Sequence, residues 1–95
     1  MAIQSFASPV ARFFLEGRLE KRVGWASQAR VAARKLDMVD YAERLADLAS
    51  PPGNRLEALK ADLAGFHSIR INDRWRVVFR WTDGGAAEVD ILDYH

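Results

Sequence analysis

The sequence contains no cysteine among its 95 residues. That absence excludes a disulfide framework, a thiolate metal site and a cysteine nucleophile, and it fits a reducing compartment. No apolar run approaches the roughly 20 residues needed to cross a membrane. Residues 1–6 also lack the basic and apolar regions of a signal peptide. We therefore expect a cytoplasmic protein that has no membrane-spanning segment.

A strong charge of either sign is also missing, because 14 Lys and Arg residues nearly balance 13 Asp and Glu residues, for a net charge of +1. The overall charge therefore gives no argument for a nucleic-acid partner. What is present is the composition of a folded protein, with 49% hydrophobic and 28% charged residues. The length suits one modest core, so we expect a single domain over residues 1–95.

The first half of the chain predicts a strand followed by two helices. Residues 2–6 alternate between apolar and polar, as in a short strand. Ser8, followed by proline, is a good N-cap, and Gly17 is a suitable residue to end a helix of about two turns. From residue 25 to residue 48, apolar side chains recur at steps of three and four, which predicts a longer helix with a break near Asp40.

The second half of the chain predicts a β-meander. After a turn at residues 50–54, a connecting segment leads to alternating stretches at residues 66–72, 75–81 and 86–95. Short turns join these consecutive strands, so they should pair antiparallel. The predicted fold is α+β: an N-terminal strand, two helices and a three-stranded antiparallel meander, with the helices packed on one face of a four-stranded sheet.

Strand periodicity divides the residues of the second meander strand between two faces of the sheet. Val77, Phe79 and Trp81 share one face, which we expect to be buried under the helices. Arg76 and Arg80 point the other way, toward an uncovered face. Two arginines there can serve solubility, or they can form an anion-binding surface.

Three side chains suited to proton transfer lie together at residues 93–95, which read Asp93, Tyr94 and His95. The simpler interpretation is a core strand that happens to end in polar residues. The pattern does not decide whether Asp93 and His95 share a face with Arg76, because a register slip of one residue would exchange the faces.

Five segments, in this order and spacing, resemble the HigB-type toxins of the RelE/ParE toxin–antitoxin superfamily. They are residues 3–6, 34–38, 51–57 with 59–60, 68–73 with 75–76, and 93–95. The resemblance implies a RelE-like fold and a ribosome-dependent endoribonuclease that cuts mRNA in the ribosomal A site without a cofactor or metal. It also implies a HigA-type helix-turn-helix antitoxin as partner, operator DNA bound only through the antitoxin complex, and no membrane.

The same resemblance implies a set of site residues. Arg76 would bind the scissile phosphate, with electrostatic help from Lys60, because a guanidinium can donate two hydrogen bonds to an anion. His95 would act as general acid or base and be oriented by Asp93, and Tyr94 would stack on a base or position the backbone. Contacts to RNA or the ribosome are expected from a further group of basic residues: Arg30, Arg34, Lys35, Arg70 and Arg80. For the basic helix residues, the alternative is an ordinary solvated surface.

One position departs from the family pattern. Some HigB toxins have a histidine just before the lysine, where this chain has Glu57. Either Glu57 replaces that histidine in proton transfer, or Asp93 and His95 do more of the chemistry. His67 is not an obvious replacement, because it falls on the same side of its strand as Ile69, and we interpret it as structural.

Two other functions remain possible for this sequence. A ParE-like relative would inhibit DNA gyrase without cutting RNA, although it would not need Arg76 and residues 93–95 together. A catalytically inactive member would serve mainly as a co-repressor with its antitoxin. The three functions differ in whether ribosome-bound mRNA is cut and whether DNA supercoiling is inhibited.

Overall fold

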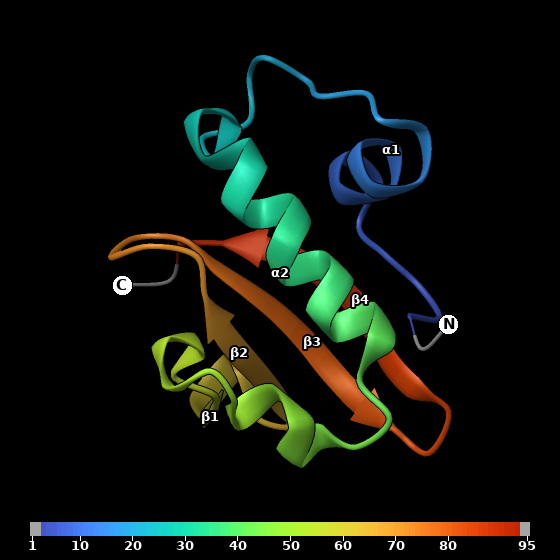
Figure 1. Cartoon of the computed structure of the whole chain (residues 1–95), viewed down its shortest axis with the longest axis vertical. Helices are drawn as coiled ribbons and strands as arrows, with labels where there is room; N and C mark the ends of the chain where they lie inside the picture. Colours follow the sequence, from blue (N-terminus) through green and yellow to red (C-terminus); the bar gives the residue numbers. More distant parts are fainter. Residues whose placement is uncertain (1–2, 94–95) are drawn as a thin grey trace.

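One antiparallel sheet organises the chain in the computed structural model, which describes residues 3–93 (Figure 1). Its strands follow one another in the order β1-β2-β3-β4. The bounds are Glu57–Ala58 for β1, Phe66–Arg70 for β2, Arg76–Thr82 for β3 and Gly85–Leu92 for β4. The α-helices are α1, Ser8–Glu16, and α2, Ala29–Tyr41. Short 3-10 helices complete the fold: η1 Ala26–Gln28, η2 Leu45–Ala49, η3 Pro52–Asn54 and η4 Ala61–Leu63.

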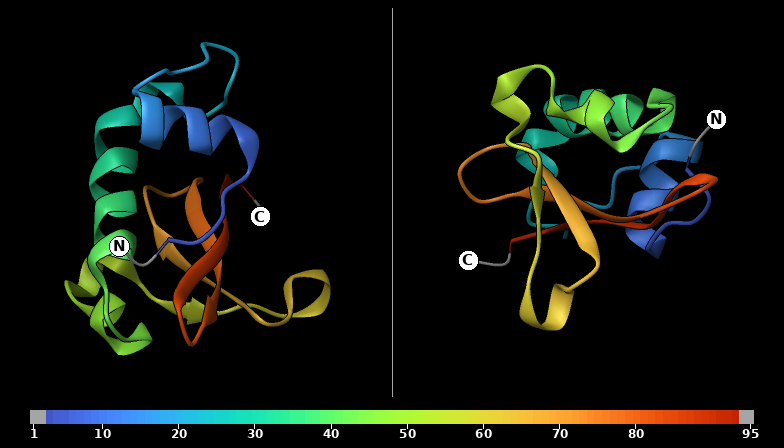
Figure 2. Two further views of the ribbon diagram at one scale, coloured as in Figure 1. Left: turned by 90° about the vertical axis from the view of Figure 1, so that its right-hand side faces the viewer. Right: turned by 90° about the horizontal axis from the view of Figure 1, so that it is seen from below.

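The core lies between α2 and one face of the sheet. Figure 1 shows α2 crossing the sheet over β3 and β4, and the two turned views of Figure 2 show the helices and the sheet as separate layers. Leu36 and Val39 of α2 and Val77 and Phe79 of β3 are all fully buried. Burying an aliphatic or aromatic side chain of this size stabilises the fold by about 1.5–3 kcal/mol. The apolar side chains that recur every three or four residues in α2 therefore pack in one core with those that recur every two residues in β3.

The predicted α+β fold and the meander are confirmed, but the N-terminal strand is wrong. Residues 4–7 run beside β4 and form a single parallel bridge, between Phe6 and Val89. The backbone N–H of Ala7 donates to the carbonyl oxygen of Val89 at 2.9 Å. Nearby, the β3–β4 register shifts and Glu88 has a φ of 53°, so the outer edge of β4 is too irregular for a longer ladder. The fourth strand is β1 instead, paired antiparallel with β2.

The C-terminal end of α1 agrees with the sequence prediction, but its N-terminal end does not. Gly17 takes the left-handed conformation predicted for it, and its N–H bonds to the carbonyl of Phe13 at 3.1 Å. Ser8 is the first helical residue rather than the cap, and the preceding Ala7 offers no side-chain hydrogen bond. Since proline follows Ser8, the first turn already lacks one of the N–H groups that a cap would satisfy.

The long helix is shorter than the apolar pattern suggested. A 3-10 turn precedes α2, and α2 ends at Tyr41, which confirms the predicted break near Asp40. The apolar pattern continues into η2, where Asp47 accepts backbone hydrogen bonds from Glu43 at 3.1 Å and Arg44 at 3.0 Å. These two bonds hold the pKa of Asp47 below its ordinary value. Across residues 3–93, the structure contains no helix long and apolar enough to span a bilayer.

The two faces of β3 are arranged as the alternation predicted. Val77 and Phe79 face the helices, and Trp81 is partly buried at the end of the strand. Val78 lies on the opposite face, yet it is only 1% exposed. Parts of the chain therefore cover the middle of this second face, which we call the open face because α2 does not lie on it (Figure 2).

Candidate active site on the open face of the sheet

Strand register brings the open-face residues into rows across the sheet. Residues directly opposite one another in antiparallel strands point to the same side. One row contains Glu57, Ser68, Val78 and Asp90, because each is the register partner of the next. Glu57 therefore lies on the open face, where it joins residues from every strand of the sheet.

The adjacent row contains the predicted phosphate ligand. Arg76 is the register partner of Arg70 on one side and of Leu92 on the other. The Arg76 guanidinium donates from Nη1 to the carbonyl oxygen of Asn72 at 2.8 Å, which anchors one end of the fork to the β2–β3 turn. Arg76 is half-buried, so its guanidinium is held at the sheet surface and not free in solvent. Arg70 forms an ion pair with Asp73 in the same turn.

The strand β4 ends at Leu92, a residue of this row. Asp93 directly follows Leu92, the register partner of Arg76, and its Oδ2 accepts a hydrogen bond of 3.1 Å from Nε of Arg74. The Asp93 side chain is 24% exposed. The predicted site residues Tyr94 and His95 lie outside the described residues. The register therefore puts Leu92, and not Asp93, on the face of Arg76, and Asp93 follows at the end of β4, where it contacts the β2–β3 turn.

Lys60 is exposed in the loop that follows β1. The N–H of Leu59 donates to the carbonyl oxygen of Phe66 at 2.9 Å, which extends the β1–β2 pairing up to the residue before Lys60. The Lys60 carbonyl oxygen in turn accepts from the N–H of Leu63 at 3.0 Å and starts η4. The backbone of Lys60 is therefore held at the edge of the sheet that also presents Glu57.

The basic residues predicted for α2 differ from one another in exposure. Arg30 and Arg34 are exposed, on a helix that covers the face opposite to Arg76. Lys35 is only 6% exposed, and its Nζ donates a hydrogen bond to Oδ1 of Asn54. Burial, followed by the charges of Arg34 and Arg70, lowers the pKa of Lys35. A buried and bonded ammonium group is not available to an RNA phosphate, so Lys35 is corrected to a structural residue.

Arg80, the remaining predicted RNA contact, lies on the open face one row away from Val78. Its guanidinium sits over the ring of Phe66, 4.6 Å from the centroid, and its Nε donates to Oε2 of Glu88 at 2.9 Å. Arg80 is exposed despite these contacts. Its charge is therefore partly balanced at the surface, while its flat guanidinium is oriented by the aromatic ring.

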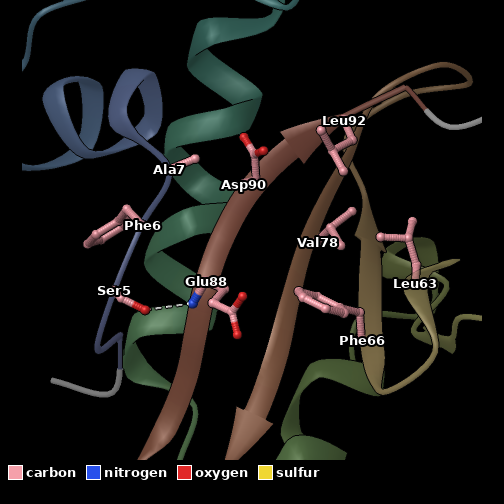
Figure 3. Close-up of a pocket in the computed structure, with 9 residues that line it drawn as sticks. All are labelled: Ser5, Phe6, Ala7, Leu63, Phe66, Val78, Glu88, Asp90 and Leu92. Atoms are coloured by element: carbon pink, nitrogen blue, oxygen red, sulfur yellow. Dashed lines mark hydrogen bonds between the residues drawn. The ribbon is translucent and has the colours of Figure 1, made fainter.

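Asp90 was missed at the sequence level, although it lies on the open face, on the edge strand β4. It lines a pocket of about 440 Å³, together with Val78 and Leu92 among others (Figure 3). Burial raises the pKa of Asp90, and a hydrogen bond from the N–H of Ile91 partly offsets this effect. The only sequence feature that could have indicated Asp90 is the position of a carboxylate between two apolar strand residues, Val89 and Ile91.

The comparison with known proteins identifies the family. A family model described as "RelE-like toxin of type II toxin-antitoxin system HigB" matches residues 4–95. The chain belongs to the HigB-like toxin family. The resemblance inferred from the sequence is therefore confirmed, and so is the RelE-like α+β fold.

Named relatives agree with this assignment. Toxin HigB-1 of Vibrio cholerae serotype O1 is 47% identical over 62 residues, which are 65% of this chain and 64% of that toxin. The match thus spans slightly less than two thirds of the Vibrio toxin. Endoribonuclease HigB of Proteus vulgaris is 30% identical over 71 residues, covering 68% of this chain and 77% of that protein. An uncharacterized protein of Haemophilus influenzae is 36% identical over 84 residues, or 88% of this chain and 81% of its own.

A solved structure supports the fold of this HigB-like toxin. The YoeB-YefM complex from Staphylococcus aureus contains a chain that matches with a TM-score of 0.58. The match covers 98% of this HigB-like toxin and 94% of that chain, at 19% sequence identity. At this level of identity the likeness concerns the fold.

His67, the histidine within residues 3–93 of this HigB-like toxin, does not lie on the open face. His67 is the register partner of Phe79, and the two rings stack with centroids 6.4 Å apart. Its Nδ1 is buried and has no hydrogen-bond partner. This packing agrees with the interpretation of His67 as structural. Among residues 3–93, no group of three or more His, Cys, Asp or Glu side chains is arranged to hold a metal ion.

Proposed function

We propose that this HigB-like toxin is a ribosome-dependent endoribonuclease that cuts mRNA in the A site and so stops translation. The observation that carries the proposal is the register of Arg76 with Leu92, immediately before Asp93. It pairs the strand that carries Arg76, whose guanidinium suits a phosphate, with the strand that leads into Asp93, the first residue of an Asp-Tyr-His segment suited to proton transfer. The name of the Proteus vulgaris relative, Endoribonuclease HigB, supports the same chemistry.

In the proposed reaction, the ribose 2′-oxygen attacks the adjacent phosphorus and transfers its proton to a general base. The bond between phosphorus and the 5′-oxygen breaks, and a general acid protonates that oxygen. The products are a 2′,3′-cyclic phosphate and a 5′-hydroxyl. Arg76 binds the scissile phosphate and stabilises the extra negative charge of the phosphorane, and Lys60 adds a positive charge from the sheet edge.

Proton transfer is assigned to the end of the chain and to Glu57. His95 acts as general acid or base with Asp93 as its orienting group, and Tyr94 stacks on a base. Glu57 shares the open face with Arg76, in the neighbouring row, which supports the view that it takes over from the histidine found in some relatives. The proposed RNA contacts do not include Lys35, which is buried. Arg70 and Arg80 would contact RNA on the open face, next to the site. Arg30 and Arg34 would contact RNA or the ribosome from a separate surface, on α2.

The proposed partners follow from membership of a type II toxin–antitoxin family. A HigA-type helix-turn-helix antitoxin binds and neutralises the toxin, and the complex contacts operator DNA through the antitoxin. Ribosomes and mRNA are the targets, so the site of action is the cytoplasm. A short helix-turn-helix reading frame next to the toxin gene would support this assignment.

Primer extension on ribosome-bound mRNA tests the activity, with the same mRNA free of ribosomes as the control. Wild type should cut within or beside the A-site codon only when ribosomes are present, and Arg76→Ala should abolish cutting. Arg18→Ala is the matched control, because that side chain is 76% exposed and lies in the loop after α1. Equal cleavage by wild type and Arg76→Ala would overturn the site. Inhibition of gyrase supercoiling without RNA cleavage would instead identify a ParE-like toxin, and neither activity would identify a co-repressor.

A further inference from the structure

The pocket on the open face is built by three distant parts of the chain (Figure 3). Residues 5–7 line one side, where they run along β4, and Leu63 of η4 lines another. Phe66, Val78 and Leu92 contribute apolar walls from the strands. Its volume of about 440 Å³ lies within the ~300–1,000 Å³ of typical small-ligand pockets.

Asp90 and Glu88 provide the carboxylates of this mostly apolar pocket, and they are used differently. Glu88 is exposed at the rim and paired with Arg80. Asp90 is half-buried, and its Oδ1 accepts a hydrogen bond from the N–H of Ile91 at 2.8 Å. That bond fixes the orientation of the carboxyl group and leaves Oδ2 as an acceptor for a donor that enters the pocket. In Figure 3 the Asp90 carboxyl group lies between Ala7 and Leu92.

Two arginines lie next to residues of the pocket wall. Arg76, opposite the pocket residue Leu92, lies in the row next to Asp90. On the other side, Arg80 lies over the ring of Phe66, another pocket residue. A ligand with an anionic backbone and flat, partly apolar groups carrying N–H donors matches this distribution. An apolar peptide side chain matches it less well, because it would leave the Asp90 carboxyl group desolvated without a donor.

We propose, on the basis of the proposed RNA cleavage, that this pocket holds an unstacked mRNA base next to the scissile phosphate, and that Asp90 accepts a hydrogen bond from the exocyclic amino group of that base. Phe66 and Val78 provide the apolar contact to the ring, and the phosphates on either side of the base run past Arg76 and Arg80. Adenine, guanine and cytosine carry an exocyclic amino group, whereas uracil does not. Uracil offers only its ring N3–H as a donor, so a carboxylate positioned for the exocyclic amino group selects against uracil.

Titration of the free toxin with AMP, GMP, CMP and UMP, followed by amide chemical shifts, tests this proposal without ribosomes. The amides of Phe66, Val78 and Asp90 should shift saturably, and UMP should bind about tenfold more weakly than the other three, as expected for loss of one hydrogen bond to a charged group. Asp90→Leu should remove the difference between UMP and the others. Asp37→Leu, which removes an exposed carboxylate of α2, is the matched control and should retain it.

Three outcomes would overturn the proposal. They are equal affinity for UMP, no saturable shift of the pocket amides at millimolar concentrations of any nucleotide, and shifts of these amides with the antitoxin alone. The last would assign the pocket to a protein partner. The test is independent of cleavage: nucleotide discrimination without mRNA cutting would contradict only the proposed function, and mRNA cutting without discrimination would contradict only the base pocket.

Discussion

Arg74 and Asp93 connect the β2–β3 turn to the end of β4, through a hydrogen bond of 3.1 Å from Nε to Oδ2. The turn itself is held by Asn72, whose Oδ1 accepts from the N–H groups of Arg74 and Trp75 at 2.9 and 2.8 Å. Asp93 is thus attached to a hydrogen-bonded turn that also anchors the Arg76 guanidinium. This arrangement links the predicted phosphate ligand and the predicted orienting carboxylate through one short segment.

Arg74→Ala should lower mRNA cleavage without unfolding the protein. The Arg74 side chain is 72% exposed, and such surface ion pairs contribute about 0–1 kcal/mol to stability. Loss of this contact removes one of the interactions that position Asp93, and misplacement of a catalytic group should reduce single-turnover cleavage by about tenfold or more. Arg12→Ala, which breaks the 2.9 Å pair with Glu20, is the control. A similar loss of cleavage in both variants would contradict a specific role for Arg74.

Lys35→Ala should destabilise the fold. Asn54 is fully buried, and its Nδ2 donates to the carbonyl oxygen of Leu48 at 3.1 Å while its Oδ1 accepts from Lys35. Removing the lysine leaves that oxygen buried without its donor, so the free energy of unfolding should fall by about 1–3 kcal/mol in urea titrations. Arg34→Ala, at the exposed neighbouring position, should change it by less than about 0.5 kcal/mol. Equal stability of the two variants would show that the buried bond contributes little.

Glu57→Gln should slow the chemical step if Glu57 transfers a proton. A positioned acid or base contributes typically 10²–10⁴-fold, so single-turnover cleavage of ribosome-bound mRNA should fall by at least about 100-fold. Glu57→His should restore much of the rate, with a different pH profile, because imidazole titrates nearer neutrality than a carboxylate. Glu43→Gln provides the control at an exposed position between α2 and η2. A Gln variant as fast as wild type would assign proton transfer to the end of the chain alone.

Asp90→Asn should alter how stability depends on pH. Burial raises the pKa of Asp90 above its ordinary value of 3.8, so the folded chain binds the proton more tightly than the unfolded chain. The resulting stabilisation is fully present below the unfolded pKa and is lost as the pH rises through the folded pKa. The variant should therefore gain stability relative to wild type as the pH rises from below about 4 toward neutrality. Urea titrations across this range provide the measurement, with Asp37→Asn as the charge-matched control. A constant difference between Asp90→Asn and wild type would contradict the prediction.

Local sequence patterns were sufficient for most of the elements. Gly17 ends α1 because a residue without Cβ takes the left-handed conformation readily, and this preference does not depend on distant residues. Alternation in β3 correctly separated Val77 and Phe79 from Arg76, because neighbouring strand residues must point to opposite faces. The resemblance to HigB toxins required only the order and spacing of segments, and the family match confirms it.

Other features depended on which segments meet in space. Residues 2–6 have a strand-like pattern, but the described part of that segment forms only a single bridge, between Phe6 and Val89. Glu57–Ala58, too short for any periodic signal, became the fourth strand. A basic residue on an amphipathic helix looks solvated, yet Lys35 is buried because Asn54, distant in sequence, supplies its hydrogen-bond acceptor. The open-face location of Glu57 likewise follows from its pairing with Ser68.

The sequence alone therefore determined the family, the α+β class and the face of the central strand that carries Arg76. These follow from short-range periodicity and from the spacing of segments along the chain. Only the tertiary structure decided that Glu57 shares that face, that Lys35 does not reach the surface, and that Asp90 lies in a pocket. Each of those outcomes depends on strand register or on a contact between segments far apart in sequence, which local pattern does not encode.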